Sequence, residues 1–183
     1  MRTFRSSSDF RLPKGIAGIN IQVLRESPLP YGATTELPSG APNYFPDASG
    51  PNHIAEFFRS FSKGDPDWDW ERETLMVFLL NTRRRLAAWT KASVGTMDTL
   101  LVHPRDVFRV AIVANAAAVV IAHNHPSGDP TPSEADIRFT REMVRAGQLL
   151  KIELLDHVVV ANPAMQVEGK GWASLRELGF FCL

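Results

Sequence analysis

A short apolar run followed by two histidines constrains the fold of this chain more than any other segment. Residues 116–122 are small and apolar, and they lead directly into His123, Asn124 and His125. If the run is a strand that continues through the histidines, His123 and His125 point to the same side, because side chains alternate along extended backbone. Two imidazoles that converge on one point suit a borderline-soft cation such as zinc. We therefore expect a metal site near the end of this strand.

The residues after the histidines predict a turn and then a helix with a third ligand. Residues 126–128 read Pro-Ser-Gly, which is turn chemistry. Ser133 is a favourable N-cap, and Asp136 falls in the first helical turn, where its carboxylate can face back toward the loop. Each residue also has a simpler explanation, as a solvated histidine, a cap or a charge near the helix dipole. Together, His123, His125 and Asp136 favour a zinc site with one open position, as in catalytic centres.

This spacing resembles the metal signature of the JAMM (MPN-plus) metallopeptidases, which is His-x-His, seven residues, Ser, two residues and Asp. The fuller string His-Asn-His-Pro-Ser-Gly, followed by Pro-Ser-x-x-Asp, resembles the RadC branch of that superfamily. Further similarity lies in residues 102–108, 115–118 and 155–160, and the resemblance covers roughly Pro51 to the C-terminus. It implies an α/β fold in which helices flank a mixed β-sheet, with the three-layer, cytidine-deaminase-like architecture of JAB/MPN domains.

The resemblance also implies a complete catalytic set. It assigns one Zn²⁺ to His123, His125 and Asp136, with a water as the fourth ligand. Glu73, which opens the apolar run of residues 74–80, corresponds to the general base of the superfamily, and Ser133 to a residue that stabilises the oxyanion. Glu71 would share the face of Glu73, but Glu73 lies directly against the apolar run and is preferred. For either glutamate, the alternative is a solvated charge at the beginning of a strand.

Two functions follow from this set. The first is a zinc-dependent metalloprotease of the JAMM type, which cleaves a peptide or isopeptide (amide) bond in a peptide or protein substrate with a metal-activated water. The alternative is a RadC-like non-enzymatic or regulatory module in a DNA-repair or mobile-element context. A binding module has no need for Glu73, so the complete set favours the hydrolase. A zinc nucleobase deaminase is excluded because it requires a Cys-x-x-Cys, and Cys182 is the single cysteine.

Composition limits the cellular location and the kinds of partner that we expect. The formal net charge of zero gives no bulk electrostatic reason for direct nucleic-acid binding. No apolar run is long enough to span a bilayer, and the N-terminus lacks the apolar core of a signal peptide. With one cysteine no intrachain disulfide can form. We therefore expect a cytoplasmic protein without a membrane partner.

The chain divides near residue 51. Residues 1–50 are expected to be an N-terminal extension, partly irregular and rich in Pro and Gly, with one strand at 19–25. Residues 51–183 are expected to form the RadC-like JAB/MPN domain. Apolar spacing predicts its helices and strands. They are helices at 52–61, 104–115, 133–150 and 174–178, and strands at 76–80, 86–91, 119–123 and 153–160.

Three other groups have two interpretations each. The pair Asp156-His157 is either an extra ligand pair or, as we prefer, a strand-end pair in which His157 supports a ligand. Residues 83–85 are three arginines, which fit a solvated hairpin turn better than a partner or nucleic-acid contact. Trp68, Trp70 and Trp89 fit either a recognition patch or an apolar core.

Overall fold

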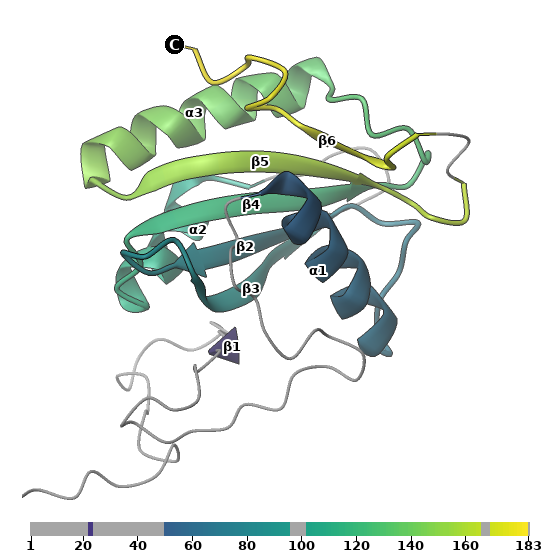
Figure 1. Cartoon of the computed structure of the whole chain (residues 1–183), viewed down its shortest axis with the longest axis horizontal. Helices are drawn as coiled ribbons and strands as arrows, with labels where there is room; N and C mark the ends of the chain where they lie inside the picture. Colours follow the sequence, from purple (N-terminus) through teal and green to yellow (C-terminus); the bar gives the residue numbers. More distant parts are fainter. Residues whose placement is uncertain (1–21, 24–49, 96–101, 166–168, 183) are drawn as a thin grey trace, which may run out of the picture.

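The computed structural model describes residues 22–23, 50–95, 102–165 and 169–182 (Figure 1). Most of the predicted N-terminal extension therefore lies outside the described residues. None of the helices in these ranges has the length and apolarity needed to cross a membrane. The helices are α1 (Pro51–Gly64), α2 (Pro104–Val113) and α3 (Glu134–Leu150). The strands are β1 (Gln22–Val23), β2 (Thr74–Leu80), β3 (Leu86–Val94), β4 (Ala118–His125), β5 (Glu153–Ala161) and β6 (Trp172–Ser174).

The strands form one mixed sheet in the order β1-β3-β2-β4-β5-β6. The pair β4 and β5 is parallel, and the other neighbours are antiparallel. The antiparallel pair β2 and β3 is a hairpin, whereas the parallel pair needs the long crossover that α3 supplies. The predicted mixed sheet is confirmed, and β4 lies in its middle.

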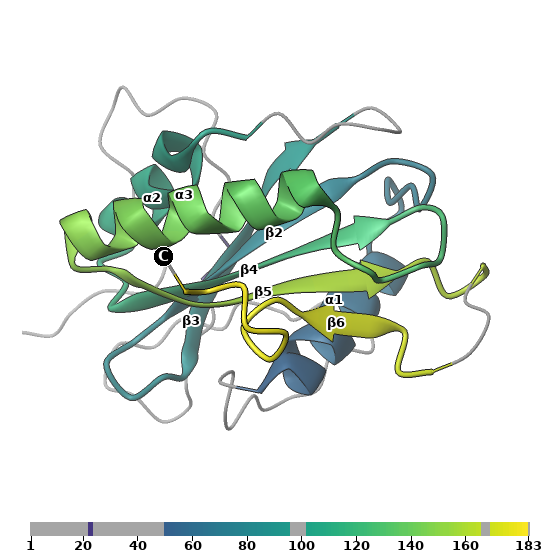
Figure 2. The ribbon, with the colours of Figure 1, turned by 90° about the horizontal axis from the view of Figure 1, so that it is seen from above.

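Helices cover both faces of this sheet. Along β2, the alternating residues Met76, Phe78 and Leu80 point toward α1, while Leu75, Val77 and Leu79 point toward α2 and α3. In Figure 2, α3 crosses in front of the sheet and α1 lies behind it. Both faces of β2 are buried, so the strand reads as one continuous apolar run. The predicted three-layer α/β architecture is confirmed.

The tryptophans belong to the core layer between α1 and the sheet. Trp68 lies edge-on against Phe58, with ring centroids 5.1 Å apart, and Trp89 lies 4.2 Å from Phe61. Trp70 packs against the same cluster. Aromatic pairs in such edge-to-face arrangements contribute packing energy beyond the area they bury. Of the two interpretations, the apolar core is the one that the structure confirms.

The predicted elements are present with two differences. The strand expected at 19–25 is described only at Gln22–Val23, where it pairs with β3, and its remaining residues lie outside the described ranges. The helix expected at 174–178 is wrong, because Ser174 ends strand β6 and the residues after it form turns. The side chain of Ser174 donates to the buried carboxylate of Asp156, 2.7 Å away, and this contact fixes the segment against β5.

The three arginines at 83–85 lie at the β2–β3 turn, as predicted. Arg84 has a left-handed backbone (φ 60°) and pairs with Glu153 at 2.9 Å, with both side chains about half exposed. An exposed pair of this kind contributes little to stability, about 0–1 kcal/mol. The cluster is therefore a solvent-facing turn joined to the start of β5.

Candidate metal centre

Strand β4 brings both histidines to the same face of the sheet. Val119 and Ile121 point toward α2 and α3, and His123 and His125 continue the same alternation beyond them. His123 is 1% exposed, whereas His125 lies nearer the surface. The strand extends two residues past the predicted end at His123, because β5 pairs with it up to His125. The prediction that both imidazoles share one side is confirmed.

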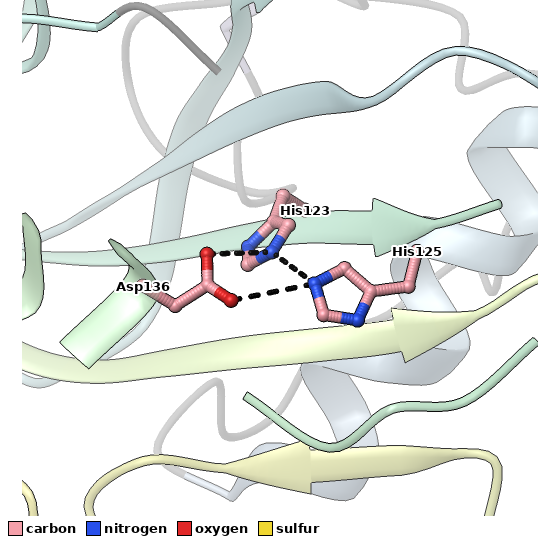
Figure 3. Close-up of side chains that lie close together, drawn as sticks. All are labelled: His123, His125 and Asp136. Carbon is pink, nitrogen blue, oxygen red and sulfur yellow. Dashed lines mark hydrogen bonds and ion pairs between the residues drawn. The ribbon is translucent and has the colours of Figure 1, made fainter. Parts of the chain in front are cut away.

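Helix α3 places the third donor, Asp136, through its own N-terminal capping. Ser133 Oγ accepts a hydrogen bond from the Asp136 backbone N–H at 3.1 Å, and Asp136 Oδ2 accepts from the Ser133 backbone N–H at 2.7 Å. This reciprocal capping box satisfies two otherwise unpaired amides and turns the carboxylate back toward the strand. Asp136 Oδ1 lies 3.2 Å from His123 Nε2, and Oδ2 lies 3.4 Å from His125 Nε2 (Figure 3).

These three donors fit a zinc-type cation. Their ligand atoms all lie within 4.8 Å of one another, and the two Nε2 atoms are 3.0 Å apart. Tetrahedral zinc with bonds near 2.0–2.1 Å separates its donors by about 3.3 Å, close to the three spacings found here. The Nδ1 atom of His125 lies 2.9 Å from the carbonyl oxygen of Asp129. A carbonyl can only accept, so Nδ1 carries the proton and Nε2 keeps a lone pair for a metal.

The charges at the centre also favour a cation. Burial disfavours the ionised form of Asp136, but the neighbouring His123 and His125 outweigh it and hold the pKa of this carboxyl well below its usual range. Burial likewise opposes the charged form of His125, yet Asp136 and the Asp129 backbone raise its pKa overall, with help from the charge of Glu73. The ionised carboxylate of Asp136 therefore attracts positive charge to this site, either a proton on His125 or a metal cation.

Glu73 lies just before β2, on the same face as the metal donors. Leu75 is paired with His123 across β2 and β4, and Glu73, two residues before Leu75, falls on the same face by the alternation of extended backbone. Its charge acts on the pKa of His125, as expected for neighbouring groups. The rival, Glu71, is exposed, and its backbone N–H donates to Asp69. Glu73 is thus close enough to act on His125 and lies outside the set of three donors, while its role as a base remains a prediction.

Asn124 fixes the backbone on both sides of Glu73. Its side chain is fully buried on the opposite face of β4 from the histidines, where Oδ1 accepts from the Thr74 N–H at 2.9 Å. Its Nδ2 donates to the carbonyl of Arg72 at 3.0 Å. The printed contacts of the Asn124 side chain are therefore with the segment that leads into β2. A polar amide within a buried strand was the signal for this contact, since such a group needs partners.

The loop itself depends on Ser127 and Gly128. Ser127 Oγ accepts from the Asp129 N–H at 3.3 Å. Gly128 has a left-handed backbone (φ 81°), and a Cβ there would lie 2.6 Å from the backbone of Met165. No side chain fits such an approach, so the glycine is required for the loop to turn beneath His125.

Ser133 is exposed beside the donors. Its hydroxyl donates to Asp136 Oδ2 at 2.6 Å while it accepts from the Asp136 N–H. Because a hydroxyl has a single proton, donation to a substrate oxygen requires this proton to rotate away from Asp136. The role of Ser133 in stabilising an oxyanion remains a prediction.

His157 lies behind His123, as preferred, but Asp156 and His157 are within β5 and not at a strand end, so that part of the prediction is wrong. His157 Nε2 is 2.8 Å from His123 Nδ1, on the side of the ring away from the donor set. Burial lowers the pKa of His157 well below its usual value, and the nearby charge of His123 lowers it further. Asp156 instead accepts from Ser174 and from the Arg176 backbone N–H. His157 is therefore the support of a ligand.

Two histidines at the end of a central strand, and an aspartate in the first turn of the next helix, define an α/β domain of the JAB/MPN type with a candidate metal centre. The RadC-like JAB domain is the family whose sequence profile matches residues 49–180. The chain therefore belongs to the RadC-like JAB domain family.

Curated relatives agree with this assignment. A UPF0758 protein of Thermotoga maritima is 46% identical over 109 residues, which cover 60% of this chain and 46% of that protein. A UPF0758 protein of Desulforamulus reducens is 42% identical over 104 residues, covering 56% and 46%. A third, from Moorella thermoacetica, is 47% identical over 92 residues, covering 50% and 40%. The matched region thus spans less than half the length of these relatives.

Proposed function

We propose that this domain is a JAMM-type zinc hydrolase that cleaves a peptide or isopeptide (amide) bond. The observation that supports the proposal is Glu73, whose charge acts on His125 and which lies outside the set of His123, His125 and Asp136. A site that only holds a metal needs the three donors, whereas hydrolysis also needs a base beside them.

Zinc is the metal that this donor set suits best. Two imidazoles and one carboxylate match the three-ligand sets of catalytic zinc sites, which keep one position open. His125, Asp136 and Ser133 lie at or near the surface, so a substrate can approach from their side. When bound there, zinc supplies Lewis acidity, which polarises a carbonyl and makes water acidic near neutral pH.

The side chains of the domain then carry the proton transfers. Hydrolysis adds water across the C–N bond of an amide and yields a carboxylic acid and an amine. In the proposed reaction, Glu73 accepts a proton from the water as its oxygen bonds to the carbonyl carbon, and delivers that proton to the departing nitrogen. The hydroxyl of Ser133 donates to the carbonyl oxygen as negative charge develops on it.

The deciding experiment compares Glu73→Gln with the wild type on quenched fluorogenic peptides and on lysine ε-linked isopeptides. Glutamine keeps the size of the side chain but cannot accept the proton. We expect unchanged zinc content and a loss of cleavage of at least about 100-fold. Glu71→Gln is the matched control, because Glu71 is exposed and lies outside the site, and it should cleave as the wild type does.

Two results would count against the proposal. If Glu73→Gln cleaves a wild-type substrate at the wild-type rate, the assigned mechanism is wrong. If a cellular phenotype survives Glu73→Gln but is lost in His123→Ala, the metal supports a regulatory or binding role, such as one in DNA repair, and hydrolysis does not. The His123→Ala variant also reports directly on the metal, since it should lose most of its zinc.

A further inference from the structure

A line of buried side chains runs from α3 to the metal donor His123. Thr140 Oγ1 lies 2.6 Å from His157 Nδ1, and His157 Nε2 lies 2.8 Å from His123 Nδ1. Thr140 and His157 are both fully buried, and His123 is nearly so. Thr140 lies one helical turn after Asp136 on α3, so the line begins beside the residue that provides the carboxylate donor.

The proton of Thr140 can be assigned from its contacts. Thr140 Oγ1 lies 2.6 Å from the backbone carbonyl oxygen of Asp136. A carbonyl has no proton to give, so the hydroxyl proton of Thr140 lies in this contact. A hydroxyl has only one proton, and therefore Thr140 accepts at its other contact. The donor in that contact is the Nδ1–H of His157.

The ring protons of His157 and of the metal donor His123 can be assigned in the same way. The ring nitrogens of His157 contact Thr140 and His123, neither of which carries a negative charge to support an imidazolium. A neutral imidazole with its proton on Nδ1 has a lone pair on Nε2. His157 Nε2 therefore accepts from His123 Nδ1–H, which leaves the lone pair of His123 on Nε2. That atom lies 3.2 Å from Asp136 Oδ1 and 3.0 Å from His125 Nε2.

We propose that Thr140 and His157 are positioning residues that hold His123 in its metal-binding tautomer. The inference rests on the proposed metal centre, and it adds the residues that control the affinity of that centre. The two histidine donors are then fixed by different means. His125 is fixed by the backbone carbonyl of Asp129, which substitution cannot remove, and His123 by two side chains, which substitution can.

The test removes the hydroxyl without changing the size of the side chain. In Thr140→Val, the Nδ1–H of His157 loses its acceptor, and the other tautomer of His157 becomes favourable. Its Nε2–H then donates to His123 Nδ1, which moves the proton of His123 to Nε2, where it blocks the metal. We expect zinc affinity, measured by chelator competition, to fall about 10- to 100-fold. Thr140→Ser keeps the hydroxyl and should restore wild-type affinity.

A second measurement reports on the tautomer without any metal. The ¹⁵N chemical shifts of the imidazoles in the metal-free protein, at about pH 9 and so well above the usual histidine pKa, distinguish Nδ1–H from Nε2–H. We expect Nδ1–H for His123 in the wild type and Nε2–H in Thr140→Val. Thr90→Val is the matched control, because Thr90 is a buried threonine on β3 and should change neither result.

The outcomes separate the failure of this inference from the failure of the proposed function. Nε2–H for His123 in the metal-free wild type overturns the inference, even if Thr140→Val does not fold. A folded Thr140→Val with wild-type zinc affinity and an unchanged tautomer also overturns it. If the wild type binds no zinc, the proposed function fails, while the tautomer measurement still decides the inference.

Discussion

At the scale of single residues, Asp136 has two tasks. Its Oδ2 accepts from the Ser133 backbone N–H and so begins α3, and its Oδ1 faces His123. A second capping box, at the start of α2, has Asp106 in the equivalent position, and Asp106 is not in the group of three metal donors found among the described residues. There Asp106 Oδ2 accepts from the His103 N–H at 3.2 Å. Comparing Asp136 with Asp106 allows the effects of capping and of metal binding to be measured separately.

Asp136→Asn and Asp106→Asn are expected to differ in metal content and not in folding. Asparagine can still accept from the N-cap amide, so each variant should lose less than about 1 kcal/mol of stability. Only Asp136→Asn removes an anionic donor, and it should lose most of its zinc. Metal analysis after dialysis measures the zinc content, and urea unfolding measures the stability. Stoichiometric zinc in Asp136→Asn would contradict the assigned ligand set.

Ser133→Ala should affect both stability and activity. The lost cap costs about 1 kcal/mol, and the lost donor should reduce cleavage by less than Glu73→Gln does. Ser133→Thr keeps a hydroxyl that caps, and it should recover most of the stability. Denaturant unfolding and initial rates on the same fluorogenic peptide measure the two effects. A Ser133→Ala variant as inactive as Glu73→Gln would assign a larger role to Ser133.

At the scale of elements, α3 ends on a residue that suits its position poorly. Lys151, the C-cap, is exposed and has a left-handed backbone (φ 57°), which costs a residue with a Cβ roughly 1 kcal/mol relative to glycine. We therefore expect Lys151→Gly to stabilise the domain by up to about 1 kcal/mol. Lys151→Ala keeps the Cβ and should give no such gain. Urea unfolding tests both variants: the midpoint should rise in Lys151→Gly and not in Lys151→Ala, with the dependence of the unfolding free energy on urea unchanged.

The contact between the end of α1 and β3 should make a pH-dependent contribution to the free energy of unfolding. Asp65 accepts from Lys91 Nζ at 2.6 Å. Burial disfavours the ionised carboxyl, but Lys91 outweighs it and lowers the pKa of Asp65. A lowered folded pKa adds stability above the unfolded value of about 3.9, and this stability is lost as the pH falls through the folded pKa.

Lys91→Met removes the cation and keeps much of the apolar stem. Because Lys91 is partly exposed, we expect a loss of about 0.2–1 kcal/mol at pH 7 and a smaller loss near pH 2, where Asp65 is protonated in both proteins. Unfolding curves at the two pH values measure the difference. Equal losses at both would show that the pair contributes packing alone.

The sequence predicted those elements whose signal is local. The apolar run of β2, the alternation through His123 and His125 and the cap at Ser133 all lie within a few residues of what they determine. The misplaced helix at 174–178 and the role of Asn124 depend on partners far along the chain. Asn124 contacts a segment 50 residues before it, and Asp156 lies 18 residues before Ser174. Local periodicity contains no information about such partners.

At the scale of the whole molecule, the core and the metal centre are separate. Apolar clusters fill both faces of the sheet, under α1 and under α2 and α3, whereas the donors lie at the end of β4 and in the first turn of α3. Folding driven by such a core does not require the metal, unlike the folding of a zinc finger. The metal adds stability only by binding to the folded state.

Chelation should therefore lower the thermal midpoint without unfolding the domain. Zinc at about 100 times its dissociation constant should add about 2.7 kcal/mol. Far-UV circular dichroism with EDTA and with added zinc measures this, and His123→Ala should show no difference between the two conditions. Loss of helical and strand signal in EDTA at 25 °C would mean that the core depends on the metal.

The positions of the site residues along the chain have a consequence for the evolution of the family. The three donors, Ser133, Thr140 and His157 all come from the continuous stretch of residues 118–161, while Glu73 is the residue just before β2. Under the proposed function, one substitution just before β2 would therefore abolish hydrolysis and leave residues 118–161 intact. The residue at the position of Glu73 should then divide members of this family into hydrolases and metal-holding proteins that share one fold.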